Sequence, residues 1–195
     1  SARLPSRIAC GTAAMLSSCA SVPGPPKQAV DSATRTALMM TQQNWRFQGR
    51  VAYSHLGKGG SAQIIWLQKA EVSDIRISAP LAIGAARIVL TPDSAQFVDS
   101  KGNVVAEGDP EAVFLQVLQT PVPNQGFVNG LRAFWPDNPE LTASALTGQV
   151  IIDQWQWRYL EWQDSPIYLP KQIEIEHVET RVRILIDSWQ ELPDG

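Results

Sequence analysis

The sequence is poor in the residues that build disulfide frameworks and metal sites, with only two cysteines and two histidines among 195 residues. Cys10 and Cys19 both lie near the N-terminus, so the rest of the chain cannot form a disulfide of its own. His55 and His177 are far apart and have neither cysteine partners nor an H-E-x-x-H context, and no metal site is predicted. Such a chain must be stabilised by apolar packing.

An excess of positive charge is also lacking, because 16 Lys and Arg stand against 19 Asp and Glu, for a formal net charge of -3. This balance argues against a nucleic-acid partner, which requires clustered basic residues. The run Gly57–Ser61 lacks the G-x-x-x-x-G-K-[ST] spacing of a phosphate loop and is better interpreted as a hairpin turn. No G-x-S-x-G nucleophile elbow occurs. A Ser-His-Asp triad stays open, but the sequence favours a binding protein without a cofactor over an enzyme.

The beginning of the chain has the order of a bacterial export signal. Arg3 and Arg7 precede an apolar run that ends at Leu16, which is too short to span a bilayer core of about 30 Å. Cys19 follows Leu-Ser-Ser directly, an order that resembles the lipobox, in which this cysteine is acylated and becomes the mature N-terminus. The alternative is an ordinary secretory signal in which Cys19 is incidental.

Three parts of the chain follow from this interpretation. We expect a signal peptide over residues 1–18, a lipidated Cys19 with a Pro-rich flexible spacer over residues 19–27, and one folded domain over residues 28–195. A domain of this length is large enough to bury a substantial core.

The periodicity of apolar residues predicts one helix followed by a series of strands. Helical spacing from about Gln28 to Gln43 predicts a first helix that packs through Ala33, Ala37 and Leu38. The period then changes to two, and the turns between strands are too short for crossover helices, which indicates an antiparallel sheet. The expected strands lie at 45–53, 62–66, 75–77, 88–90, 95–97, 155–159, 169–176 and 183–187.

Two further helices are expected in the middle of the chain. Asp109 as N-cap and Pro110 at the first helical position predict a helix whose buried stripe contains Val113, Phe114, Val117 and Leu118. A second helical pattern places Phe127, Val128, Leu131 and Phe134 on one side before Pro136 and Pro139 end it. The fold class is therefore mainly β, in an α+β arrangement.

Four segments, taken in order behind the lipobox, carry a family resemblance: Gly49–Tyr53, Gly60–Gln68, Ile77–Leu81 with Gly84, and Pro121–Pro123. They resemble the LolB family, outer-membrane receptors that accept lipoproteins from the periplasmic carrier LolA. The resemblance implies an incomplete antiparallel β-barrel with about three helices covering an apolar cavity. It also implies a lipid-anchored, periplasm-facing location at the outer membrane, since Ala20 stands where Asp would favour retention in the inner membrane. Phe127 or Val128 occupies the place of a family tryptophan.

The cavity would have to shield acyl chains from water. A chain of about 14 methylenes costs roughly 11 kcal/mol in water at about 0.8 kcal/mol per CH₂, so the cargo cannot cross the periplasm uncovered. An apolar lining could bind such chains whatever protein carries them. The residues predicted to line it are Trp66, Ile75, Ile77, Ile88, Leu90, Trp157, Ile184 and Ile186. The alternative is that the same residues fill a closed core.

A second functional position is Leu81, where the family has an apolar residue on a protruding loop. Exposed there, Leu81 could enter the membrane surface, whereas the alternative is a turn leucine folded back onto the sheet. The implied partners are a LolA-like periplasmic carrier, acylated lipoprotein cargo and the outer membrane, and we expect a monomer. Competing hypotheses are a tethered structural or assembly lipoprotein, a periplasmic lipid-binding enzyme and a soluble LolA-like carrier.

Overall fold

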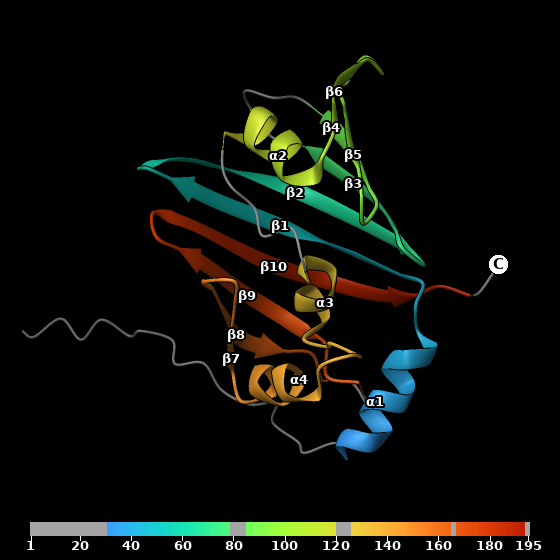
Figure 1. Ribbon diagram of the computed structural model, residues 1–195. Coiled ribbons are helices and arrows are strands. Elements are labelled where there is room, and N and C mark those ends of the chain that lie inside the picture. Colours follow the sequence, from blue (N-terminus) through green and yellow to red (C-terminus); the bar gives the residue numbers. More distant parts are fainter. Residues whose placement is uncertain (1–30, 79–84, 120–125, 165–166, 194–195) are drawn as a thin grey trace, which may run out of the picture.

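The computed structural model describes residues 31–78, 85–119, 126–164 and 167–193, which form one open antiparallel sheet and four helices (Figure 1). The ten strands lie in the order β6-β5-β4-β3-β2-β1-β10-β9-β8-β7, so β1 pairs with β10 in the middle of the sheet. Their bounds are β1 Trp45–His55, β2 Lys58–Lys69, β3 Val72–Ser78, β4 Ala85–Leu90, β5 Ala95–Val98, β6 Val104–Gly108, β7 Gln149–Ile152, β8 Trp155–Trp162, β9 Pro170–His177 and β10 Thr180–Glu191.

The alternation in the sequence decides which face of each strand is buried. In β1, Trp45 and Phe47 are buried and Gln48 is exposed, and in β8 Trp157 and Tyr159 are buried. Each predicted strand is found, and the predicted incomplete antiparallel barrel is confirmed. A hairpin is found where it was predicted, but its turn is Leu56 and Gly57, which have the positive φ angles that twisted hairpins require, and residues 58–61 already belong to β2.

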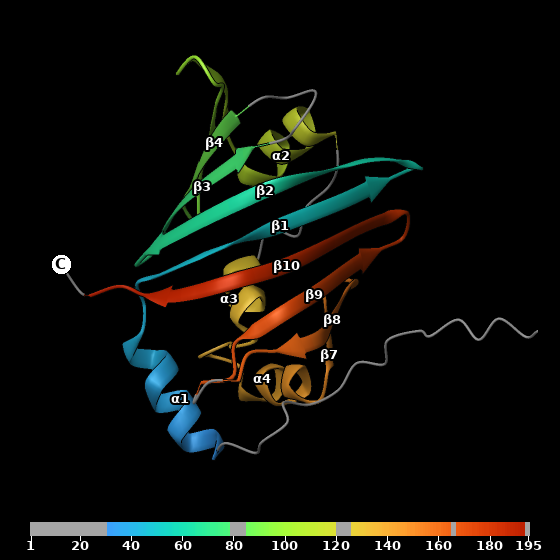
Figure 2. The ribbon, with the colours of Figure 1, turned by 180° about the vertical axis from the view of Figure 1, so that it is seen from behind.

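The sheet curves around a concave side that carries the helices (Figures 1 and 2). Helix α2 (Pro110–Leu118) contacts β5 and β6, α3 (Phe127–Arg132) contacts β9, and α4 (Pro139–Leu146) contacts β7 and β8. Helix α1 (Ser32–Thr41) lies at the end of the sheet where β1 begins. The concave face is therefore enclosed by the sheet on one side and by short helices on the other.

Helix α2 forms as its sequence predicts. The Asp109 carboxylate accepts a hydrogen bond from the Ala112 backbone N–H at 3.0 Å, and Pro110 occupies the first turn. Such a cap satisfies one of the backbone donors that a helix start leaves without a partner.

Helix α4 contradicts the prediction that Pro139 only ends a helix. Asn138 caps the Leu141 N–H at 3.1 Å, and Pro139 takes the first helical position, where its missing N–H costs nothing. The structure therefore has four helices rather than about three within its described residues. Strands β6 and β7 at the two sheet edges were also not predicted; they are short, and β6 exposes Val104 and Val105.

The packed face of α1 differs from the predicted one. Ala33 and Ala37 are exposed, whereas Arg35 and Met39 are buried. The Arg35 guanidinium donates hydrogen bonds to the carbonyl oxygens of Ile167 at 2.9 Å and Arg132 at 3.0 Å. These bonds attach α1 to the rest of the domain. The helix is therefore held by a charged residue, Arg35, and not by the alanines that the sequence pattern predicted.

His177, the last residue of β9, packs against an aromatic residue. Its ring stacks on Trp155 with the ring centroids 4.7 Å apart and an interplanar angle of 27°. The contact covers one face of the Trp155 indole at the end of β8, which explains why His177 is only partly exposed.

Candidate functional site

The concave face of the sheet brings the predicted lining residues together. All eight belong to, or pack against, one apolar cluster that extends across the whole sheet, from β6 to β7. Ile77 and Leu90 are half-buried at its margin, while the other six are no more than 3% exposed: Trp66, Ile75, Ile88, Trp157, Ile184 and Ile186. In this structure the six buried residues pack against protein atoms, so only the marginal pair is accessible without rearrangement.

Phe127 of α3 links the two halves of this cluster. Its ring stacks on Trp66 of β2 with centroids 5.6 Å apart and meets Trp157 of β8 edge-on at 5.4 Å. Strands β2 and β8 are separated in the sheet by three other strands. The aromatic contacts of Phe127 therefore span the curved sheet and hold α3 across it.

Gly130 allows α3 to approach the sheet closely. A Cβ at this position would lie 2.6 Å from two ring atoms of Trp157. The Tyr159 hydroxyl donates a hydrogen bond of 2.8 Å to the Gly130 carbonyl, and burial raises the pKa of Tyr159 well above its ordinary value. The phenol therefore stays protonated and keeps donating this bond at physiological pH.

The predicted cavity lining left out several half-buried residues that border the same cluster. Val51 and Tyr53 continue the inward alternation of β1, and Val128 faces the cluster from α3. The alternation that identified Trp66 could have identified the two β1 residues too. Together with Ile77 and Leu90, these residues form the accessible margin of the apolar face.

Two predicted functional residues lie outside the described part of the chain. They are Cys19, the predicted lipid attachment site, and Leu81, the predicted membrane-inserting residue. Their roles therefore remain predictions. No helix within the described residues is both long enough and apolar enough to cross a membrane.

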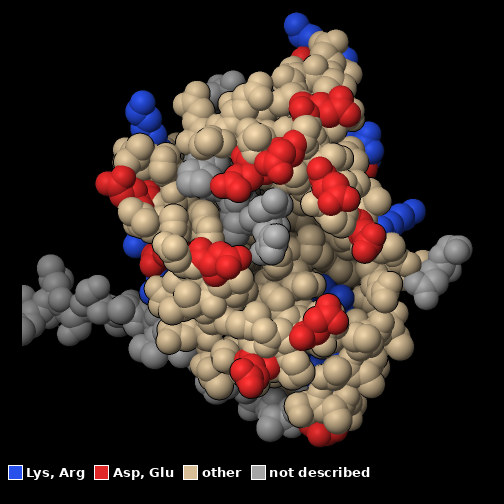
Figure 3. Space-filling model, in the orientation of Figure 1, with Lys and Arg blue, Asp and Glu red and all other residues tan. Residues whose placement is uncertain are grey.

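Acidic side chains dominate the helix-bearing side of the molecule, as Figure 3 shows. Asp109 and Glu111 of the α2 region and Glu140 of α4 are exposed. Arginines such as Arg50 and Arg183 lie instead on outward-facing positions of β1 and β10. An acidic surface repels polyanions such as nucleic acids. In the described ranges, no group of three or more His, Cys, Asp or Glu could hold a metal ion.

The protein is an open antiparallel half-barrel whose apolar concave face is covered by short helices. This arrangement defines its structural class. The family model described as "Outer membrane lipoprotein LolB" matches residues 43–189. The chain therefore belongs to the LolB family.

Similar proteins cover nearly the whole chain. An outer-membrane lipoprotein LolB of Azoarcus sp. (strain BH72) is 28% identical over 187 residues, which are 94% of this chain and 93% of that protein. One from Xanthomonas oryzae pv. oryzae (strain MAFF 311018) is 31% identical over 203 residues, covering 91% and 92% respectively. Among solved structures, a DUF1329 family protein from Desulfovibrio piger ATCC 29098 has a TM-score of 0.51 and 11% identity, over 86% of this chain and 93% of that one. That likeness concerns the fold alone.

Proposed function

We propose that this protein is an outer-membrane lipoprotein receptor, which accepts acylated lipoproteins from a LolA-like periplasmic carrier and inserts them into the outer membrane. The observation that carries the proposal is the continuous apolar face inside the half-barrel, which extends across the sheet beneath short helices. Membership of the LolB family and the names of the relatives support the same role.

The proposed cargo site is the space that opens when the helices move away from the concave face. Acyl chains would enter along the half-buried margin at Ile77 and Leu90 and then replace contacts that Phe127 now makes with Trp66 and Trp157. The exchange substitutes one apolar contact for another, so it needs no nucleotide. Directional transfer requires only that the receptor bind cargo more tightly than the carrier does, by about 1.4 kcal/mol for each tenfold bias.

The lipid anchor provides the first test. Cys19→Ala should remove acylation and release the protein from the outer membrane without unfolding it, because the predicted spacer separates Cys19 from the domain. Metabolic labelling with palmitate and membrane fractionation measure this, with a circular dichroism spectrum as the control for folding. Labelling that persists in Cys19→Ala would contradict the proposed attachment site.

The cargo site is tested by placing a charge on the margin of the concave face. Ile77→Glu should reduce cargo acceptance from the carrier by at least about tenfold, because a carboxylate facing an acyl chain has no compensating partner. Ile65→Glu is the matched control, since Ile65 is also half-buried but lies at an outward-facing position of β2. Acceptance is measured as acylated lipoprotein transferred to the receptor in a soluble assay.

The comparison of these two variants separates the competing functions. A loss in Ile77→Glu alone supports acyl-chain binding on the concave face. Equal acceptance by both variants and the parent would contradict the proposed cargo site. A loss of partner binding in Ile65→Glu alone would favour the tethered assembly protein, which would use the outer face of the sheet instead.

A further inference from the structure

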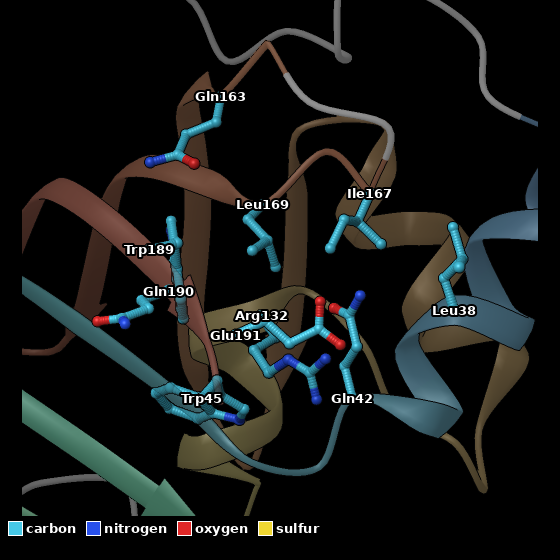
Figure 4. A pocket seen from close by; sticks show the side chains of 10 residues that line it. All are labelled: Leu38, Gln42, Trp45, Arg132, Gln163, Ile167, Leu169, Trp189, Gln190 and Glu191. Atoms are coloured by element: carbon cyan, nitrogen blue, oxygen red, sulfur yellow. The ribbon is translucent and has the colours of Figure 1, made fainter. Parts of the chain in front are cut away.

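A pocket of about 380 Å³ lies beside α1 at the end of the sheet, and Trp45 is the residue of the apolar cluster that lines it. This volume is within the range of about 300–1,000 Å³ that is typical of small-molecule sites. Figure 4 shows its side chains, which come from α1, the start of β1, α3, the segment between β8 and β9, and the end of β10. They are Leu38, Gln42, Trp45, Arg132, Gln163, Ile167, Leu169, Trp189, Gln190 and Glu191.

The pocket contains a buried arginine without a carboxylate partner. Arg132 is 9% exposed, and within the described residues neither it nor the adjacent Arg35 has a carboxylate oxygen within 4.0 Å. Most of the other described arginines have a carboxylate partner, as in Arg158 with Glu174 at 2.8 Å and Arg87 with Asp74 at 2.8 Å. The most deeply buried guanidinium groups are thus the ones that lack a counter-ion.

The groups in contact with Arg132 compensate its charge only weakly, and the one carboxylate among the pocket residues, Glu191, acts on it from beyond ion-pair distance. Its Nη2 lies 3.3 Å from the Met39 sulfur and 3.5 Å from the Met39 carbonyl oxygen, and its guanidinium lies 6.0 Å from the Trp45 ring centroid. Behind it, the buried Nη1 of Arg35 has no hydrogen-bond partner. Burial lowers the pKa of Arg132 to about 10, so the group still carries its charge at neutral pH. A buried, charged and weakly bonded guanidinium is expected to bind an oxyanion strongly.

Glu191 gives the same pocket a negative group at its exposed rim. Both residues line the pocket, yet they form no ion pair within 4.0 Å. The amides of Gln42, Gln163 and Gln190 offer further hydrogen bonds around them. The pocket is thus dipolar, with positive charge at depth and negative charge at the opening.

We propose that this pocket binds a phosphoethanolamine group, with its phosphodiester on Arg132 and its ammonium on Glu191. The indoles of Trp45 and Trp189 would pack against the glycerol end of the ligand. The charge pattern provides selectivity. A phosphoglycerol group lacks the cation that Glu191 would attract, and a phosphocholine group carries a cation without N–H donors for the carboxylate.

The test uses acyl-free compounds, so that binding to the proposed cargo face does not contribute. Calorimetric titration of the full chain with glycerophosphoethanolamine, glycerophosphoglycerol and glycerophosphocholine should show the first bound at least about tenfold more tightly than the other two. Glu191→Gln should reduce the protein's preference for glycerophosphoethanolamine over glycerophosphoglycerol to about twofold or less. Glu179→Gln, an exposed carboxylate in the β9–β10 turn, is the matched control and should keep it.

Arg132→Gln should weaken binding of all three compounds, and a melting curve shows whether that variant is folded. Glu191 is exposed, so its variant tests the proposal even if the Arg132 variant does not fold. Vesicle flotation then separates the two sources of the group. Glu191-dependent binding to vesicles containing phosphatidylethanolamine assigns a lipid headgroup, and titration binding without flotation assigns a free phosphoethanolamine compound.

Undetectable binding of glycerophosphoethanolamine by the parent chain at about 10 mM would overturn the proposal, as would an unchanged preference in Glu191→Gln. Cargo transfer plays no part in either measurement. A failure here therefore leaves the proposed receptor function untouched, and a failure of the Ile77→Glu test leaves the pocket untouched.

Discussion

Gly130→Ala is expected to destabilise the domain by about 2–3 kcal/mol, because its new methyl group would overlap a ring that cannot move away. The methyl carbon would lie 2.6 Å from two atoms of the Trp157 ring, closer than two carbon atoms can approach. Trp157 is only 1% exposed, and the Phe127 ring meets it edge-on with the ring centroids 5.4 Å apart. Relief of the clash would therefore move α3 and loosen the hydrogen bond of the Tyr159 hydroxyl.

Thermal unfolding measures this effect, and the midpoint should fall by roughly 4–10 °C. Gly60→Ala is the matched control, because its methyl group would meet the Tyr53 side chain at an ordinary contact distance of 3.4 Å. That variant should melt close to the parent. If Gly130→Ala also melts with the parent, α3 is held more loosely than its contacts indicate, and its displacement by cargo would cost little free energy.

The sheet could be predicted from the sequence because alternation acts residue by residue. Strand β8 illustrates this, since Trp155, Trp157 and Tyr159 alternate with polar residues and are all buried. The α2 start was predictable for a similar reason: Asp109 and Pro110 act on their own backbone. Such signals are local, so tertiary context does not overturn them.

The errors arose where long-range contacts decide the outcome. Arg35 looks like a solvent-facing residue, and only the carbonyl groups of Arg132 and Ile167, about 100 and 130 positions away, make its burial favourable. The Arg132 pocket was likewise not foreseen, because five separate segments supply its walls. Pro139 is a local exception: a proline can end one helix or begin the next, and here the neighbouring Asn138 cap makes it begin one.

The predicted lining residues show a third limit. Alternation correctly places Trp66 and Ile184 on the concave face, but a buried apolar residue has the same pattern in a closed core and in a cavity wall. The half-buried state of Ile77 and Leu90 could be found only in three dimensions. These two residues are therefore the better places to test cargo binding, since substitution of the fully buried ones would also disturb folding.

Leu81→Glu is expected to separate the two halves of the proposed function, sparing acceptance of cargo from the carrier and abolishing most delivery into the bilayer. The proposed role of Leu81 is to enter the membrane surface. A carboxylate in its place makes that costly, by about 2.5–3.5 kcal/mol at the bilayer centre and less near the interface. The family resemblance implies a protruding loop at Leu81, and because such a position contributes little to core packing, stability should change by no more than about 0.5 kcal/mol.

The chain offers a closely matched control in Leu56, a leucine in the β1–β2 turn that is 61% exposed. Leu56→Glu adds the same charge to a turn and should leave both steps unchanged. A two-stage assay counts cargo bound to the receptor and then cargo recovered in liposomes. If both variants lose delivery equally, the added charge itself repels the membrane, and Leu81 has no special role. If neither variant loses delivery, Leu81 is not needed for insertion. The proposed lipid anchor on Cys19 would then be the remaining contact with the bilayer, and cargo would pass to the membrane directly from the concave face.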